Sequence, residues 1–542
     1  MSGAPAAAHP AAHPAAHPTA HPTAPVPTGP AELCALVLGA DPGADGPARA
    51  ATVGAVPVRR ADLAGPAERW SHRLQAAGVR PGEVVGVPAR KDPETLAAVL
   101  ACWRLGASAL LTPTALPPEL LADVLGRGGC RLLVDAPAGT TTALAPAAGA
   151  LPAPDPDTAL VLTTSGSTGR PKLVPLPAGS VARFATWAAQ RFGFAPGTRV
   201  LSLAPLNFDL SLLEVWAALA AGAEVVLADP EVVARGRSLL RVLQEHSPHL
   251  VQAVPVFLDP LVRAAPEAVS LPGTRHVLLT GDVVGSDTLR GVLRLFPSAS
   301  VVNVYGSTET NDSFLHEVVR GDATGEPPGP HPLPIGRPLP GVEALLLDAD
   351  GRAVPGAGEG ELVVRTPFQS RCYLDPAVTA QRFTVLGTTI PAQPGPGHDP
   401  ATAAGRTWFR TGDLARRRED GTVELVGRLD HQVKVRGTAV NLAEVERVLG
   451  THPGVRAAAV TTEPCPTGGR RLIAVVQVAP GPGDPAAPGE LELRRHCTTL
   501  LHRAAVPTRL HLTGAPLPTT TTGKVDRTAA LRELRAEGTV IP

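Results

Sequence analysis

The sequence lacks an excess of charge of either sign. Its 542 residues contain 49 Lys and Arg against 49 Asp and Glu, and only 18% of the positions are charged. Binding to a nucleic-acid backbone depends on a field of basic side chains. Nucleic acid is therefore not expected as a partner.

Paired cysteines and long apolar runs are also missing. The six cysteines are scattered, with no CxxC pair and no Cys/His cluster at zinc-binding spacing. We interpret them as reduced thiols, most of them core residues. The first ten residues, MSGAPAAAHP, have no basic n-region followed by an apolar segment, and no later stretch holds about 18 uninterrupted apolar residues. The sequence therefore predicts a cytoplasmic protein that is neither secreted nor inserted in a membrane.

The first thirty residues repeat His-Pro-x-Ala with a period of four, which places His9, His13, His17 and His21 in a proline-rich string. Such a string cannot bury a core, so residues 1–30 are predicted to be a disordered tail. The alternative, a metal site made of these histidines, is disfavoured because an extended chain gives them no fixed geometry.

From residue 31 the pattern predicts an α/β fold. Apolar runs of strand length alternate with helical stretches, among them GEVVGVPA, RVLSLAPL, AEVVLA, HLVQAVPV, RHVLLTG and SVVNVYG. This alternation indicates βαβ units, and runs that are apolar throughout indicate sheets covered by helices on both faces. We expect a large N-terminal domain at 31–429, with an insertion loop at about 387–404.

After Gly421 the segments become shorter, charged and alternating. The stretch NLAEVERVLG reads as a helix whose start resembles a capping box, because Asn441 precedes Glu444 by three residues. A smaller, mobile α+β domain is therefore expected at 430–542.

A phosphate-binding loop is indicated where TTSGSTGRPK (163–172) directly follows the strand-like TALVL. Gly166 and Gly169 allow backbone N–H groups to point at an anion, and Lys172 adds positive charge. The alternative is an ordinary glycine-rich surface loop, and the segment does not match the Walker A pattern. Further donors in the loop are the hydroxyls of Thr164, Ser165, Ser167 and Thr168.

Seven motifs in this order resemble the adenylate-forming enzymes, which include acyl-CoA ligases, luciferases of the firefly type and the adenylation domains of nonribosomal peptide synthetases. The resemblance covers roughly residues 50 to 530. It rests on TSGSTGRPK (164–172), NFDLS (207–211), NVYGSTET (303–310), GELVV (360–364), RTGDL (410–414), GRLDHQVKVRG (427–437) and PTTTTGKVDR (518–527).

The resemblance implies an ATP site with Mg²⁺. Tyr305 would stack on adenine, Glu309 would hold Mg²⁺ on the triphosphate, and Asp413 would accept hydrogen bonds from the ribose hydroxyls. Arg428 would hold the nucleotide from the other side. The alternatives are a core aromatic for Tyr305, a surface carboxylate for Glu309 and a surface arginine at a domain junction for Arg428. The nucleotide-contacting segment also includes Gly306, Ser307 and Thr308.

The resemblance further implies a C-terminal domain that swings about Asp430 between two poses. Lys524 in TGKVDR would enter the site in the adenylate-forming pose and stabilise the charge that develops there. Lys434 in QVKVRG would face the site in the thioester-forming pose, and a solvated strand lysine is its alternative. Ala439 and Asn441 depart from the family pattern, in which an arginine and a glutamate usually follow the RG.

The motif NFDLS suggests an α-amino acid as the substrate. Asp209 matches the position at which amino-acid-activating members pair a carboxylate with the substrate ammonium, and the alternative is a helix-capping aspartate. A buried Asp312 would need a partner, so the substrate would carry an amine or a hydroxyl. By resemblance, the substrate side chain would be lined by Leu210, Leu213, Ala253, Leu278, Thr280, Val304, Asp312 and Ser313.

GKVDR favours the peptide-synthetase branch, yet no carrier or condensation domain is recognised. We therefore expect a stand-alone ligase that loads the phosphopantetheine thiol of a separate carrier protein, and the need for a small helper protein is left open. An acyl-CoA or aryl-CoA ligase using free CoA is the alternative. A catalytically inactive homologue that acts as a binding or scaffold protein is disfavoured, because the chain retains all four of Lys172, Glu309, Asp413 and Lys524.

Overall fold

The computed structural model describes residues 25–39, 51–145, 149–164, 170–320, 333–386, 407–429, 432–435, 438–465, 470–478, 488–518, 525, 527, 529 and 530. Most of the predicted tail, the predicted insertion at 387–404 and the predicted hinge Asp430 lie outside these residues. In the part that is described, no helix is long and apolar enough to cross a membrane.

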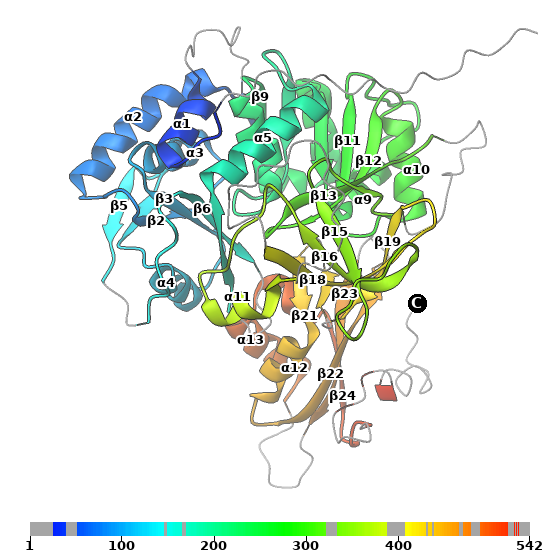
Figure 1. Ribbon diagram of the computed structural model, residues 1–542. Helices are drawn as coiled ribbons and strands as arrows, with labels where there is room; N and C mark the ends of the chain where they lie inside the picture. The colour runs from blue at the N-terminus through cyan, green and yellow to red at the C-terminus, as the bar shows by residue number, and fades with distance from the viewer. Residues whose placement is uncertain are drawn as a thin grey trace, which may run out of the picture.

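An eight-stranded sheet forms the centre of the larger body (Figure 1). Its five inner strands, β9, β8, β10, β11 and β12, run parallel, and the outer strands are antiparallel to their neighbours. The predicted strands RVLSLAPL, AEVVLA, HLVQAVPV, RHVLLTG and SVVNVYG are all confirmed here. In spatial order the strands are β1 (Ala55–Val58), β9 (Glu224–Ala228), β8 (Arg199–Ser202), β10 (Leu250–Ala253), β11 (His276–Thr280), β12 (Ser300–Ser307), β13 (Asn311–Glu317) and β14 (Arg337–Pro338).

A six-stranded sheet lies beside it and carries the predicted phosphate loop. The strand predicted from GEVVGVPA is its β2, and TALVL forms part of β6. β6 and β7 pair antiparallel with Thr164 opposite Lys172, so the two strands bracket the loop. The order is β5 (Thr140–Ala143), β4 (Leu132–Asp135), β2 (Val84–Pro88), β3 (Ser108–Thr112), β6 (Thr158–Thr164) and β7 (Lys172–Pro177).

One apolar core joins these two sheets, with helices between them. Residues 95–103 of α3 (Pro93–Arg104) are all buried, as expected for a helix enclosed on every side. α5 (Ala178–Phe192) and the π-helical turn Leu212–Ala217 share this core, and Trp216 lies 4.7 Å from Trp103, centroid to centroid.

The remaining helices cover the outer faces, which confirms the predicted α/β class. α8, α9 and α10 pack on the far face of the central sheet, α4 on the far face of the second, and α1 and α2 against α3. The bounds are α1 (Pro30–Leu38), α2 (Arg60–Ala76), α4 (Pro118–Arg127), α6 (Ala218–Ala220), α7 (Pro230–Val233), α8 (Gly236–His246), α9 (Pro255–Ala264) and α10 (Ser286–Leu295).

A third, antiparallel sheet carries the RTGDL and GRLD motifs on adjacent strands, with Asp413 opposite Arg428. α11 (Pro376–Arg382) precedes one of its strands. The strands are β15 (Glu343–Leu347), β16 (Gly358–Arg365), β17 (Phe383–Val385), β18 (Thr407–Arg417) and β19 (Val423–Arg428).

The C-terminal elements form a smaller α+β unit with its own core, drawn in orange and red in Figure 1. The helix predicted from NLAEVERVLG is α12, and the Glu444 N–H donates to Asn441 Oδ1 at 3.2 Å, which confirms one half of the predicted capping box. The elements are β20 (Gln432–Val435), β21 (Thr438–Asn441), α12 (Leu442–Gly450), β22 (Val455–Pro464), β23 (Arg470–Val478), α13 (Glu490–Leu500), a 3₁₀ turn (Arg503–Ala505) and β24 (Arg509–Thr513).

Candidate active site

A cavity of about 940 Å³ opens at the carboxyl ends of β8, β10, β11 and β12. In open α/β sheets this edge is where ligands bind, because loops leaving the strands converge there. β18 and β19 of the third sheet form another wall, and the smaller unit closes the cavity with residues from β20, β21 and the neighbouring segments.

Most of the predicted site residues line this one cavity, although their motifs are spread over some 270 residues of sequence. They come from the first two sheets, the third sheet and the smaller unit. The lining includes Thr164, Lys172, Asp209, Leu210, Leu213, Ala253, Thr280, Val304, Tyr305, Gly306, Ser307, Thr308, Glu309, Asp312, Asp413, Arg428 and Lys434.

Two predicted substrate contacts, Leu278 and Ser313, are not on the cavity wall, and both are fully buried. Leu278 lies opposite Gln252 in the ladder, inside the apolar core. Ser313 follows Asp312 along β13, so its side chain points to the opposite face, where its hydroxyl bonds to Asn311 O at 3.1 Å.

Several predicted residues lie outside the described part of the chain. These are the phosphate-loop residues Ser165, Gly166, Ser167, Thr168 and Gly169, the hinge Asp430 and the catalytic Lys524.

Asp413 lies between two donors on the cavity wall. Tyr305 Oη donates to its Oδ2 at 2.5 Å, and Arg428 Nη1 donates to its Oδ1 at 2.7 Å. Burial and the adjacent carboxylate hold the pKa of Tyr305 well above its ordinary value, so the phenol stays a donor. The two motifs YGSTE and RTGDL are thereby joined into one polar group.

Tyr373, which sequence reasoning missed, makes the equivalent contact with Glu309. Its hydroxyl donates to Glu309 Oε1, and Lys172 Nζ lies 5.3 Å from the centroid of its ring. The chain has only two tyrosines, and both line this cavity and donate to a carboxylate. That scarcity was the one sequence signal available for Tyr373.

Glu309 fits the expected Mg²⁺ role by its chemistry. Mg²⁺ is commonly held by one or two protein carboxylates together with phosphate oxygens, and Glu309 presents one carboxylate on the cavity wall. Within the described ranges no group of three or more His, Cys, Asp or Glu side chains is arranged to hold a metal by itself.

A tight turn shapes the segment that carries Glu309. Gly306 lies opposite Asp312, and a Cβ at position 306 would approach Asn311 O to 2.2 Å. Asn311 itself has a positive φ of 56°, which asparagine tolerates better than most residues, and its Nδ2 donates to Phe368 O at 2.9 Å. The turn therefore needs glycine at 306.

Two aspartates, Asp209 and Asp312, line the cavity and interact electrostatically. Burial raises the pKa of Asp209, which the Lys434 charge opposes and the Glu309 charge reinforces. Burial, with the charge of Asp209, raises the pKa of Asp312 to about 8. The walls around both are largely apolar, with Leu210, Leu213 and Val304 among them.

Two electrostatically coupled side chains, Lys91 and Glu214, support the loop that leads to Asp209. Lys91 Nζ donates to Ser202 O at 2.7 Å, and Glu214 accepts from the N–H groups of Leu203 and Ala204 at 2.9 and 3.0 Å. Burial raises the pKa of Glu214 to about 7 and lowers that of Lys91 to about 8, each opposed by the charge of the other. Sequence reasoning missed this pair.

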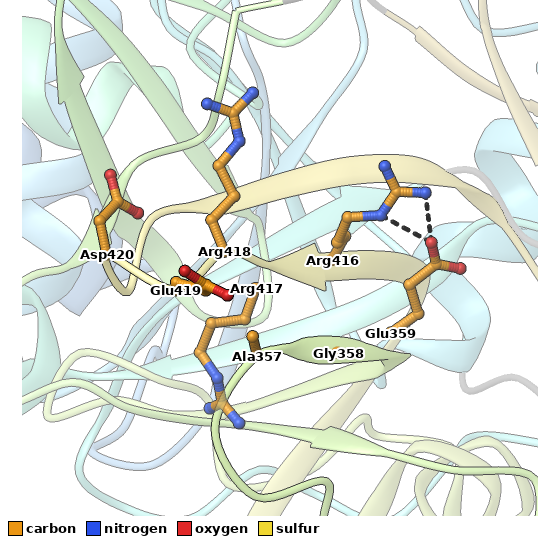
Figure 2. Close-up of a pocket in the computed structure, with 8 residues that line it drawn as sticks. All are labelled: Ala357, Gly358, Glu359, Arg416, Arg417, Arg418, Glu419 and Asp420. Atoms are coloured by element: carbon orange, nitrogen blue, oxygen red, sulfur yellow. Dashed lines mark hydrogen bonds and ion pairs between the residues drawn. The ribbon is translucent and has the colours of Figure 1, made fainter.

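A second hollow lies on the outer surface along β16 and β18 (Figure 2). Arg416 turns toward Glu359, Arg418 pairs with Glu424, and Arg417 donates to Val354 O at 2.5 Å. Because its cations are already paired, this hollow is the weaker candidate for a ligand site.

Two family models match the chain. The model described as AMP-binding enzyme matches residues 47–374, and that described as AMP-binding enzyme C-terminal domain matches residues 444–524. The matched ranges contain most of the cavity-lining residues.

Two curated relatives are each longer than this chain. Phosphinothricin tripeptide synthetase PhsC of Streptomyces viridochromogenes is 34% identical over 495 residues, which is 87% of this chain and 42% of that protein. Phenyloxazoline synthase MbtB of a Mycobacterium species is 34% identical over 479 residues, 85% of this chain and 38% of that protein. The chain thus spans less than half the length of these relatives.

Solved structures of similar fold include IdnL1, with a TM-score of 0.69 and 29% identity over 85% of this chain and 92% of that one. PA1221, an NRPS protein containing adenylation and PCP domains, has a TM-score of 0.69 and 27% identity, and the match covers 88% of this chain and 80% of that one. The amide bond synthetase McbA from Marinactinospora thermotolerans has a TM-score of 0.73 and 26% identity, and the match covers 93% of this chain and 99% of that one.

Proposed function

Because the chain belongs to the AMP-binding enzyme family, as an AMP-forming ligase of the adenylation type found in nonribosomal peptide synthetases, we propose that it activates an α-amino acid with ATP. The product is the aminoacyl adenylate, whose aminoacyl group is then transferred to the phosphopantetheine thiol of a carrier protein with release of AMP.

One observation carries the choice of an amino acid. Asp209 is a half-buried carboxylate on the wall of the cavity, in the NFDLS segment that leads into the π-helical turn. A carboxylate in an apolar cavity strongly favours a substrate with a matching cation over a plain acid, because an uncompensated charge there is costly. We assign Asp209 to the substrate α-ammonium.

In the first half-reaction, a carboxylate oxygen of the amino acid attacks the α-phosphorus of ATP, and the bond to pyrophosphate breaks. Lys172 and the loop at 165–169 would hold the phosphates, Tyr305 would contact adenine, and Asp413 and Arg428 would contact the ribose. Mg²⁺ at Glu309 would neutralise charge on the triphosphate. Lys524 would enter the site and stabilise the negative charge of the transition state.

In the second half-reaction, the carrier thiol attacks the acyl carbon and AMP leaves. Lys434 lines the cavity and is the cation that acts on Asp209, which supports a thioester-forming arrangement of the smaller unit. We propose that Asp430 is the hinge between this pose and the one in which Lys524 acts.

ATP–pyrophosphate exchange with a panel of amino acids and simple carboxylic acids tests the first step. Exchange with one amino acid that is lost in Asp209→Ala but kept in the surface variant Asp287→Asn would support the proposal. Exchange confined to acids without an α-amine would contradict it and favour an acyl-CoA or aryl-CoA ligase.

The acceptor and the two lysines are tested separately. Lys524→Ala should abolish exchange, whereas Lys434→Ala should keep exchange and lose thioester formation on a phosphopantetheinylated carrier protein, followed by intact-protein mass. Wild-type exchange in Lys524→Ala would refute the role of that lysine. Efficient thioester formation with free CoA alone would refute the carrier assignment.

A further inference from the structure

Two buried acceptor oxygens without partners belong to residues on the wall of the cavity. Within the described part of the chain, Asp312 Oδ2 and Gln252 Oε1 make no hydrogen bond and are almost fully screened from solvent. Gln252 is 1% exposed, and both residues line the cavity. Buried polar atoms in folded proteins almost always have a partner, so a ligand is expected to supply the missing donors.

The two residues reach the cavity from different strands. Gln252 lies near the carboxyl end of β10, opposite Leu278, and Asp312 lies on β13, opposite Gly306. Asp209 reaches the same cavity from the loop after β8 and acts electrostatically on Asp312. Two carboxylates therefore share one largely apolar space.

Each class of substrate side chain meets these groups differently. An aliphatic side chain would leave both oxygens unpaired, at a cost of roughly 5- to 150-fold in affinity for each group. An acidic side chain would add a third carboxyl group to the same space. A hydroxyl would satisfy one acceptor but would supply no charge that favours ionised Asp312, whereas an ammonium group donates up to three hydrogen bonds and supplies the positive charge that lets Asp312 ionise.

We infer that the amino acid activated here carries a second amino group, which Asp312 holds while Asp209 holds the first. The inference rests on the proposed function, because it assumes that the cavity binds the amino acid to be adenylated. The substrate class is then a diamino acid, with the distance between its two amines set by the separation of the two carboxylates.

Exchange assays with matched substrate pairs test the inference. The pairs are 2,4-diaminobutyrate with 2-aminobutyrate, ornithine with norvaline and lysine with norleucine, and homoserine tests the hydroxyl. Wild-type enzyme should prefer the diamino member of at least one pair by about 100-fold or more in kcat/KM. Asp312→Asn, which keeps the shape and removes the charge, should lose most of that preference, and Asp287→Asn should retain it.

The outcomes separate this inference from the proposed function. Preference for the monoamino member in every pair, preference for homoserine, or an unchanged preference in Asp312→Asn would each overturn the second-amine assignment, while amino-acid activation would stand. Exchange only with acids that lack any amine would overturn both. The wild-type comparison alone decides the matter if Asp312→Asn does not fold.

Discussion

The buried carboxyl of Asp312 should make the stability of the protein depend on pH in a way that Asp312→Asn removes. Its pKa rises from 3.8 to about 8 on folding, because burial and the charge of Asp209 disfavour the ionised form. Between these values the folded state holds a proton that the unfolded state has lost. The free energy of unfolding therefore falls as pH rises from about 4 to about 8, and the effect levels off above that.

The size of the effect follows from the shift. A full proton difference changes the free energy of unfolding by about 1.4 kcal/mol per pH unit, so the interval from pH 5 to pH 8 corresponds to at most about 4 kcal/mol. Relaxation around the site reduces this figure, and we expect about 2–4 kcal/mol. In a protein of this size that is a difference of a few °C in Tm.

Thermal unfolding of wild type and Asp312→Asn in parallel buffers from pH 5 to pH 9 measures the effect. The variant should gain stability relative to wild type as pH rises, since the titration of groups that do not interact with Asp312 cancels in the difference. Asp287→Asn, at a site whose side chain is 93% exposed, is the matched surface control. A flat difference for Asp312→Asn would refute the argument that this carboxyl is held protonated.

Three further predictions concern contacts that sequence reasoning did not identify. Tyr373→Phe removes the donor to Glu309 and should lower kcat/KM for MgATP in the exchange assay by roughly 10- to 100-fold, because a hydrogen bond to a charged group contributes about 1.5–3 kcal/mol. The Tm should change by no more than about 2 °C. Unchanged ATP kinetics would count against the contact. Glu214→Gln removes one of the two carboxylate charges, with Asp229, that act on Lys91 and weakens the acceptor for Leu203 N–H and Ala204 N–H, so it should lower stability in urea by about 1.5–3 kcal/mol. Lys91→Met should restore part of this loss, and an equal loss in the double variant would contradict the coupling. Gly306→Ala places a Cβ against Asn311 O and should abolish exchange. The control Gly273→Ala should be neutral, because a Cβ at position 273 would meet no atom within 4 Å. Full activity of Gly306→Ala would show that the turn is not required.

Patterns of composition and periodicity were enough to predict the fold class and the strand runs. GEVVGVPA, RVLSLAPL and RHVLLTG became β2, β8 and β11 because short runs that are apolar throughout have no stable place except in a covered parallel sheet. Most of the described residues that the motifs named also line the cavity, since catalytic groups of this kind lie in loops that follow strands.

Predictions from the sequence were wrong or missing for residues whose position depends on contacts with distant parts of the chain. Leu278 was expected in the substrate pocket but lies behind the wall, and Gln252, its partner across the ladder, reaches the cavity instead. Ser313 was expected beside Asp312, yet the two-residue period of β13 turns it to the other face. Tyr373 comes from a segment with no motif, and only folding brings its hydroxyl to Glu309.

By itself, then, the sequence determined which segments form strands and helices and which residue types could handle phosphate, ribose and an ammonium group, because these depend on local pattern and on intrinsic chemistry. The tertiary structure alone decided that Tyr305, Asp413 and Arg428 form one hydrogen-bonded group and that Asp209 and Asp312 share one apolar space. Strand register and burial set those distances and dielectric surroundings, and neither is encoded in any single stretch of the chain.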